Sequence, residues 1–286
     1  MSDTQFAKVA VLGAGTMGAG IAQVCAQAGS TVVLQDITDE FVQKGLARVQ
    51  AFLQKGVDRG KTTEAVRDEV LSRITITSDR KEAATDADLV VEAVPEKLEL
   101  KNGLFRELAD IVSPSCVLGS NTSSLSLARV FEGVVNPERC IGMHFFNPVP
   151  LMKLLELVRT DATSQATIDS VTAYSKQLGK EPIIVKDSPG FASSRLGVCL
   201  GLEAIRMLES GVASAEDIDK AMVLGYGHPM GPLKLTDLVG LDVRLAIADY
   251  LRIELDLAGF EAPELMRKMV ADGKLGKKSG QGFYAW

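Results

Sequence analysis

The sequence predicts an α/β protein in which a doubly wound parallel sheet is followed by an all-helical C-terminal domain. Over about the first two-thirds of the 286 residues, short β-branched runs alternate with helical patterns. The runs are nearly continuous in apolar residues, as expected for strands that are covered on both faces. After residue 187 helical periodicity continues without a convincing strand. We therefore expect two domains, residues 1–187 and 188–286.

The elements of the first domain follow one another in a regular order. Strands are expected at residues 8–13, 31–36, 87–94, 116–121 and 140–146, and helices at 18–28, 39–60, 97–112 and 123–131. Two further strands, 153–160 and 181–187, bracket a helix at 164–179. In the second domain helices are expected at 191–210, 214–224, 232–258 and 262–272. Ser214 is a good N-cap for one of these helices and is followed by acidic residues.

Composition excludes several classes of protein. The net charge is −6 and no basic block occurs, so neither nucleic acid nor an anionic membrane is expected as a partner. No apolar stretch is long enough to span a membrane or to serve as a signal, which favours a cytoplasmic protein. Four separated cysteines and two histidines offer no metal-site spacing and no disulfide framework.

A glycine-rich turn follows the first predicted strand. Gly13, Gly15 and Gly18 form G-x-G-x-x-G, the next helix begins there, and Asp36 closes the second strand 18 residues after Gly18. This context is the dinucleotide fingerprint of a Rossmann-type domain. Gly13 allows the turn, Gly15 allows a pyrophosphate to approach the backbone, and Gly18 allows helix and strand to pack closely.

The cofactor expected at this turn is NAD. The helix N-terminus offers N–H groups to the phosphates, and the turn also contains Ala14, Thr16 and Met17. Asp36 is expected to accept hydrogen bonds from the ribose hydroxyls and to repel a 2′-phosphate. No arginine follows it, which favours NAD over NADP.

Two polar residues interrupt apolar strands in the second half of this domain. His144 lies in "GMHFFNPVP", where an imidazole is either a packed core residue or a proton-transfer group. Glu156 interrupts "LLELV", and it either faces solvent or points inward and needs a donor. If the two side chains meet, the carboxylate orients the imidazole and leaves the other ring nitrogen as a base.

The segment "SNTSSL", residues 120–125, follows another strand. Its hydroxyl and amide groups fit a helix N-cap, and they also fit ligand binding at the end of a parallel strand. Both interpretations remain open from the residues alone.

Taken together, these motifs resemble the 3-hydroxyacyl-CoA dehydrogenases, including the short bacterial 3-hydroxybutyryl-CoA dehydrogenases. The matching segments run along the whole chain: "GAGTMGAGIA", "VVEAVPE", "SNTSSL", "HFFNPVPLMKLLELV", "KDSPGF", "PMGPLKLTDLVGLD" and "GKKSGQGFY". The resemblance implies reversible hydride transfer between NAD and C3 of a 3-hydroxyacyl-CoA thioester. It also implies a helical domain that forms a homodimer.

The resemblance assigns roles to individual residues. It implies that His144 is the general base, that Glu156 orients it, and that Ser123 binds the substrate oxygen and the nicotinamide side. Further positions that match the cofactor side of the family's site are Glu96, Lys101, Asn147 and Lys278.

Two positions bear on the substrate. Ser194 stands where the family usually has an asparagine that holds the reacting oxygen, and a serine is shorter and has a single donor. Arg59 lies about where the family has a lysine near the CoA 3′-phosphate. The cluster of Lys55, Arg59 and Lys61 also fits an ordinary solvated helix end.

The sequence thus predicts an NAD-dependent L-3-hydroxyacyl-CoA dehydrogenase for short acyl chains. Two alternatives remain. A dehydrogenase of the same architecture could act on a hydroxy acid or sugar acid without CoA, and Ser194 leaves room for this. A non-catalytic protein that only binds NAD is the second alternative, and the presence of both His144 and Glu156 argues against it.

Overall fold

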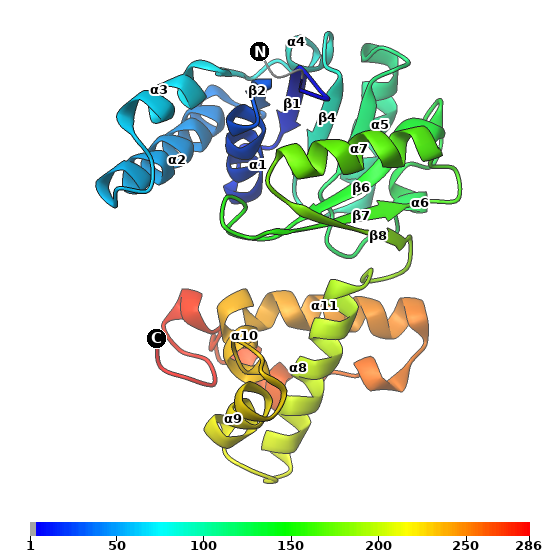
Figure 1. Ribbon diagram of the computed structural model, residues 1–286. Helices are drawn as coiled ribbons and strands as arrows, with labels where there is room; N and C mark the ends of the chain where they lie inside the picture. Colours follow the sequence, from blue (N-terminus) through cyan, green and yellow to red (C-terminus); the bar gives the residue numbers. More distant parts are fainter. Residues whose placement is uncertain (1–3) are drawn as a thin grey trace. The chain divides into compact units, whose positions relative to one another are not determined.

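The structure is a computed structural model that describes residues 4–286. The chain divides into two compact units, one ending at Asp187 and the other beginning at Ser188. The first unit contains an eight-stranded sheet with helices, and the second is built from helices and their connections (Figure 1). The predicted fold class is therefore confirmed.

The strands of the first unit form one sheet in the order β3-β2-β1-β4-β5-β6-β7-β8. Their bounds are β1 (Lys8–Leu12), β2 (Thr31–Gln35), β3 (Ile74–Thr77), β4 (Leu89–Glu92), β5 (Val117–Ser120), β6 (Cys140–Phe145), β7 (Leu154–Arg159) and β8 (Glu181–Lys186). All neighbours run parallel except β6 and β7. The connection between those two, residues 146–153, is too short for a crossover helix, so β7 returns antiparallel.

Helices cover both faces of this sheet. They are α1 (Thr16–Gln27), α2 (Asp39–Asp58), α3 (Glu64–Ser72), α4 (Arg80–Ala84), α5 (Leu98–Ile111), α6 (Leu127–Val130), the 3-10 turn η1 (Pro137–Arg139) and α7 (Gln165–Gln177). Successive side chains of β6 point to opposite faces of the sheet. Ile141 and Met143 point to one face, where they join the apolar core with α1 and α7. A Cβ on Gly142 would instead meet Leu127 of α6 at 2.6 Å. His144 follows Gly142 by two residues and therefore lies on the α6 face.

The second unit has its own apolar core, to which Ile205 and Leu251 belong. Its elements are α8 (Ser193–Glu209), α9 (Ala215–Tyr226), α10 (Pro232–Val239), α11 (Leu241–Leu255), η2 (Ala258–Phe260), α12 (Glu264–Ala271) and η3 (Lys277–Ser279). Ser214 caps α9 as expected, and its side chain accepts the N–H of Asp217.

Three local expectations were wrong. The sequence predicts one helix over 232–258, but Gly240 adopts a φ of 108° and separates α10 from α11. The helix expected at 123–131 is limited to α6, because side chains hold residues 121–125 as a loop. No element is predicted between residues 61 and 86, whereas α3, the edge strand β3 and α4 lie there. The four residues of β3 are too few to give a clear periodic signal.

Over residues 4–286, no helix is long and apolar enough to cross a membrane. The same residues contain no group of three or more His, Cys, Asp or Glu side chains that could hold a metal ion.

Candidate active site

The glycine-rich turn connects the carboxyl end of β1 to the N-terminus of α1. Gly13 has a φ of 99°, and a Cβ there would lie 2.6 Å from the carbonyl oxygen of Ala93. A Cβ on Gly18 would lie only 1.6 Å from the carbonyl oxygen of Gly13. A Cβ on Gly15 would meet nothing within 4 Å. The fold itself requires glycine at positions 13 and 18, whereas only a ligand in the open space would require Gly15.

A pocket of about 940 Å³ opens beside this turn, at the carboxyl ends of β1, β2 and β4. Its walls come from the turn, from the residues after β2 including the start of α2, from the first residue of α4, from the residues after β4, and from α5: Gly13, Gly15, Thr16, Met17, Asp36, Ile37, Phe41, Arg80, Ala93, Val94, Pro95, Glu99, Leu100, Gly103, Leu104 and Glu107. No side chain caps α1, so its first N–H groups face an incoming anion. From β1 the sheet continues through β2 and β3 on one side and through β4 and the later strands on the other. Dinucleotides bind at this point of reversal in doubly wound sheets. The residues present fit a dinucleotide.

Asp36 lies at the mouth of this pocket, directly after β2. Its Oδ2 accepts the N–H of Ala14 at 2.7 Å, and its Oδ1 accepts the N–H of Ile37 at 2.7 Å. The carboxylate therefore braces the glycine turn as well as lining the pocket.

We expect Asp36→Ala to weaken NADH binding about tenfold and to reduce the preference for NADH over NADPH, because the variant no longer repels a 2′-phosphate. Asp36→Asn is the matched variant, since its amide oxygen can still accept the N–H of Ala14. Kd values for both cofactors, obtained by fluorescence titration, test this role. An unchanged preference in both variants would mean that Asp36 only supports the turn.

His144 and Glu156 face each other across the antiparallel pair β6 and β7. The two residues are register partners, and Nδ1 of His144 lies 2.9 Å from Oε2 of Glu156. The side chain of Glu156 is fully buried, so it does not face solvent. The ring of Phe146 lies against the imidazole with centroids 4.4 Å apart.

This geometry fixes the chemistry available to the imidazole. An ionised carboxylate can only accept, so Nδ1 carries a proton towards Glu156. Proton transfer to or from a ligand then falls to Nε2. A buried carboxylate next to the ring also stabilises the imidazolium that forms when Nε2 takes a proton.

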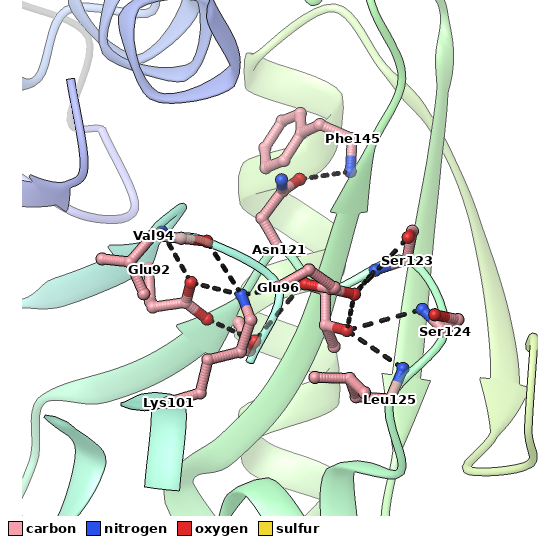
Figure 2. A network of polar contacts seen from close by, with 11 residues as sticks. Glu92, Val94, Glu96, Lys101, Asn121, Ser123, Ser124, Leu125 and Phe145 are labelled. Carbon is pink, nitrogen blue, oxygen red and sulfur yellow. Dashed lines mark hydrogen bonds and ion pairs between the residues drawn. The ribbon is translucent and has the colours of Figure 1, made fainter. Parts of the chain in front are cut away.

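A second polar arrangement joins the carboxyl ends of β4 and β5 to α5. Figure 2 shows Lys101 between Glu92 and Glu96, with its Nζ 2.5 Å from Oε1 of Glu92 and 3.1 Å from Oε2 of Glu96. The other oxygen of Glu92 accepts the hydroxyl of Ser120 at 2.6 Å. The side chains of Lys101 and Glu92 are 1% and 0% exposed. Burial raises the pKa of Glu92, and Lys101 acts in the opposite direction.

The loop after β5 depends on this arrangement. Oε1 of Glu96 accepts the hydroxyl of Thr122 and, at 3.0 Å, the N–H of Ser123. Oδ1 of Asn121 accepts the N–H of Phe145 at 2.9 Å, which ties the loop to the strand that carries His144 (Figure 2). The loop is thus organised by tertiary contacts, and its polar residues are more than a helix cap.

The remaining predicted residues lie elsewhere in their units. Asn147 lines a smaller pocket of about 210 Å³ together with Thr16. Arg59 is exposed at the C-terminal end of α2. In the second unit, Ser194 lies in the first turn of α8, and Lys278 forms an ion pair with Asp242.

Sequence reasoning missed two supporting residues. Glu92 ends an apolar strand and could have been noticed in the same way as Glu156. Lys180 is buried, and its Nζ donates to the carbonyl oxygens of Val149 and Met152 at 2.5 and 2.8 Å. It thereby holds the connection that follows His144. A lysine at the start of a strand gives no sequence signal for such a role.

Known proteins match this chain along its whole length. The NAD-binding domain of 3-hydroxyacyl-CoA dehydrogenase matches residues 8–188, and the C-terminal domain of the same family matches residues 190–286. A probable 3-hydroxybutyryl-CoA dehydrogenase of Deinococcus radiodurans is 46% identical over 279 residues, covering 98% of this chain and 100% of the relative. The mitochondrial hydroxyacyl-coenzyme A dehydrogenase of Sus scrofa is 44% identical, covering 97% of this chain and 90% of the relative.

A crystal structure is similar over the same extent. The structure of (S)-3-hydroxybutyryl-CoA dehydrogenase from Ralstonia eutropha has a TM-score of 0.93 and 44% identity, and the match covers 98% of this chain and 99% of that one.

Proposed function

The chain belongs to the 3-hydroxyacyl-CoA dehydrogenase family and is an NAD-dependent oxidoreductase, and from this premise we propose that it interconverts short-chain L-3-hydroxyacyl-CoA and 3-oxoacyl-CoA thioesters. The substrate we propose first is 3-hydroxybutyryl-CoA, which the names of the relatives from Deinococcus and Ralstonia include. The observation that carries the chemical part is the buried His144–Glu156 pair on the sheet that also holds the dinucleotide turn.

The proposed reaction uses the pair as a general base and acid. Bound NAD supplies the acceptor for the hydride from C3. Nε2 of His144 removes the proton of the 3-hydroxyl group, and Glu156 stabilises the resulting imidazolium. In the other direction the imidazolium returns the proton to the 3-oxo oxygen. Ser123 lies on the loop joined to β6 by Asn121, and we assign it to the substrate oxygen.

The second unit, residues 188–286, has two proposed roles. We assign to it the contact between subunits of a homodimer and part of the substrate site, including Ser194. Lys278 and Asn147 are proposed on the cofactor side. Sedimentation of the purified protein measures the assembly, and a monomer at micromolar concentration would contradict it.

Arg59 is proposed to bind a phosphate of CoA. Its exposed guanidinium belongs to the short basic segment of Lys55, Arg59 and Lys61 at the end of α2. We expect Arg59→Glu to raise KM for acetoacetyl-CoA about tenfold, because attraction becomes repulsion, while KM for NADH stays unchanged. Arg80→Glu is not a suitable control because Arg80 lines the cofactor pocket. Lys268→Glu, a charge reversal in α12 of the second unit, serves instead. Equal effects on both substrates would refute the assignment.

A direct assay tests the proposed function. Reduction of acetoacetyl-CoA by NADH is followed at 340 nm and extended to a kcat/KM series from C4 to C16 3-oxoacyl-CoA substrates. We expect turnover with the highest kcat/KM at the short end. Turnover only with free hydroxy acids or sugar acids would support the CoA-independent alternative. NADH binding without turnover of any 3-oxoacyl-CoA would support a non-catalytic protein.

A further inference from the structure

The arrangement of buried Glu92 and Lys101 with the partly exposed Glu96 contains more negative than positive charge. The two carboxylates are in contact with donors: the Lys101 ammonium, the N–H groups of Val94 and Ser123, and the hydroxyls of Ser120, Thr122 and Ser123. Burial raises the pKa of Glu92, but the Lys101 ammonium at 2.5 Å and the donors of Val94 and Ser120 favour its ionised form. Two ionised carboxylates and one ammonium leave a net charge of −1.

The sheet order places this charge between the two ends of the cofactor site. A pyrophosphate on α1 lies at the carboxyl end of β1, and a nicotinamide ring that exchanges a hydride with the substrate must lie near His144 on β6. The strands between β1 and β6 are β4 and β5, which carry Glu92 and Ser120 at their ends. At about 4.8 Å per strand, the ring falls within roughly 10 Å of the charged group.

The network also forms part of the pocket wall. Oε1 of Glu92 accepts the N–H of Val94 at 2.7 Å, and Nζ of Lys101 lies 3.3 Å from the Val94 carbonyl oxygen. Val94 lines the pocket of about 940 Å³. Figure 2 shows Glu92 and Val94 side by side, each with a contact to Nζ of Lys101.

We propose that the net negative charge of Glu92, Lys101 and Glu96 discriminates between the two redox states of the cofactor, by binding the cationic nicotinamide of NAD⁺ more favourably than the neutral ring of NADH. In this role Glu92 is a positioning and specificity-determining residue, since it is buried and acts through the field rather than through contact. The inference rests on the proposed function only for the position of the ring near His144.

The direction in which a variant changes the ratio of Kd for NAD⁺ to Kd for NADH follows from the net charge of the three side chains. Glu92→Gln keeps the volume of the side chain and removes one negative charge, so the network becomes neutral. We expect the ratio of Kd for NAD⁺ to Kd for NADH to rise about three- to fifteenfold, the scale of one unit charge at roughly 10 Å in an effective dielectric near 20, allowing for screening. Glu96→Gln should change the ratio in the same direction. Its side chain is 39% exposed, so the variant is expected to fold.

The double variant Glu92→Gln with Lys101→Met is the decisive comparison. It perturbs the site more than Glu92→Gln alone, yet it restores the net charge to −1. We therefore expect the ratio to return to within twofold of wild type even if both affinities fall. Ser120→Ala is the neutral control, because it removes a hydrogen bond to the same carboxylate at constant charge.

Both Kd values are measured by calorimetric titration of the full chain without substrate, so the result does not depend on turnover. The proposal is overturned if neither single variant raises the ratio, or if the double variant keeps the raised ratio. Failure of the proposed function would be seen separately, as absence of 3-oxoacyl-CoA reduction in protein whose binding ratio behaves as expected.

Discussion

The variant His144→Gln is expected to lower kcat for acetoacetyl-CoA reduction at least ~100-fold, the usual scale for loss of a general acid or base. Glutamine has a similar length, and its amide can still donate to Oε2 of Glu156, which lies 2.9 Å from Nδ1 of the native ring. It cannot hold or release a proton at neutral pH. NADH affinity should be retained, because the N–H groups expected to bind the pyrophosphate lie at the glycine turn after β1, three strands from β6. Steady-state kinetics and an NADH titration on the same sample measure the two quantities.

The chain provides its own control for this experiment. His228, the other of its two histidines, lies in the connection after α9, and His228→Gln should leave kcat unchanged. Glu156→Gln is the informative partner, because it keeps a hydrogen-bonding group against the ring and removes the charge that stabilises the imidazolium. We expect it to lower kcat, because the imidazolium that forms during the reaction loses its stabilising charge. Near-normal turnover in His144→Gln would contradict the assignment of His144 as the proton-transfer group.

The parts of the site that could be predicted from sequence are those encoded by adjacent residues. The turn from Gly13 to Gly18 and the position of Asp36 follow from one strand–helix–strand unit, which folds by local rules. The contact between His144 and Glu156 could only be proposed, because spacing does not reveal whether two strands are antiparallel or in which register. The short connection of residues 146–153 determines both, as the structure shows.

The network around Lys101 could not be predicted in this way. Its members come from β4, α5 and the end of β5, and their contacts depend on how these elements pack. A pattern of hydrophobicity says that a helix such as α5 has a buried face, but not that a lysine on that face meets two carboxylates. The break at Gly240 was missed for a related reason, since a glycine within a helical pattern is often tolerated.

The variant Gly15→Ala separates a ligand-binding role from a structural one more clearly than any other change in the turn. Gly15 has a φ of −66°, which alanine adopts without strain, and a Cβ there meets nothing within 4 Å. We therefore expect the free energy of unfolding to stay within about 0.5 kcal/mol of wild type. The methyl group would occupy the space in which a pyrophosphate approaches α1. Loss of one or two charge-assisted hydrogen bonds there corresponds to a Kd for NADH that is ~10- to 100-fold higher.

Two other glycines make the comparison specific. In Gly18→Ala the new Cβ would lie 1.6 Å from the carbonyl oxygen of Gly13, so α1 and β1 must separate and the unfolding temperature should fall markedly. In Gly225→Ala, within α9, the Cβ meets nothing within 4 Å and lies in the second unit, so neither stability nor NADH binding should suffer. Thermal unfolding and NADH titration of the three variants give three different pairs of results. The methyl group of Gly15→Ala meets no other part of the protein, so it can weaken NADH binding only by direct contact with the cofactor. If Gly15→Ala binds NADH as tightly as Gly225→Ala does, the pyrophosphate does not lie against this turn.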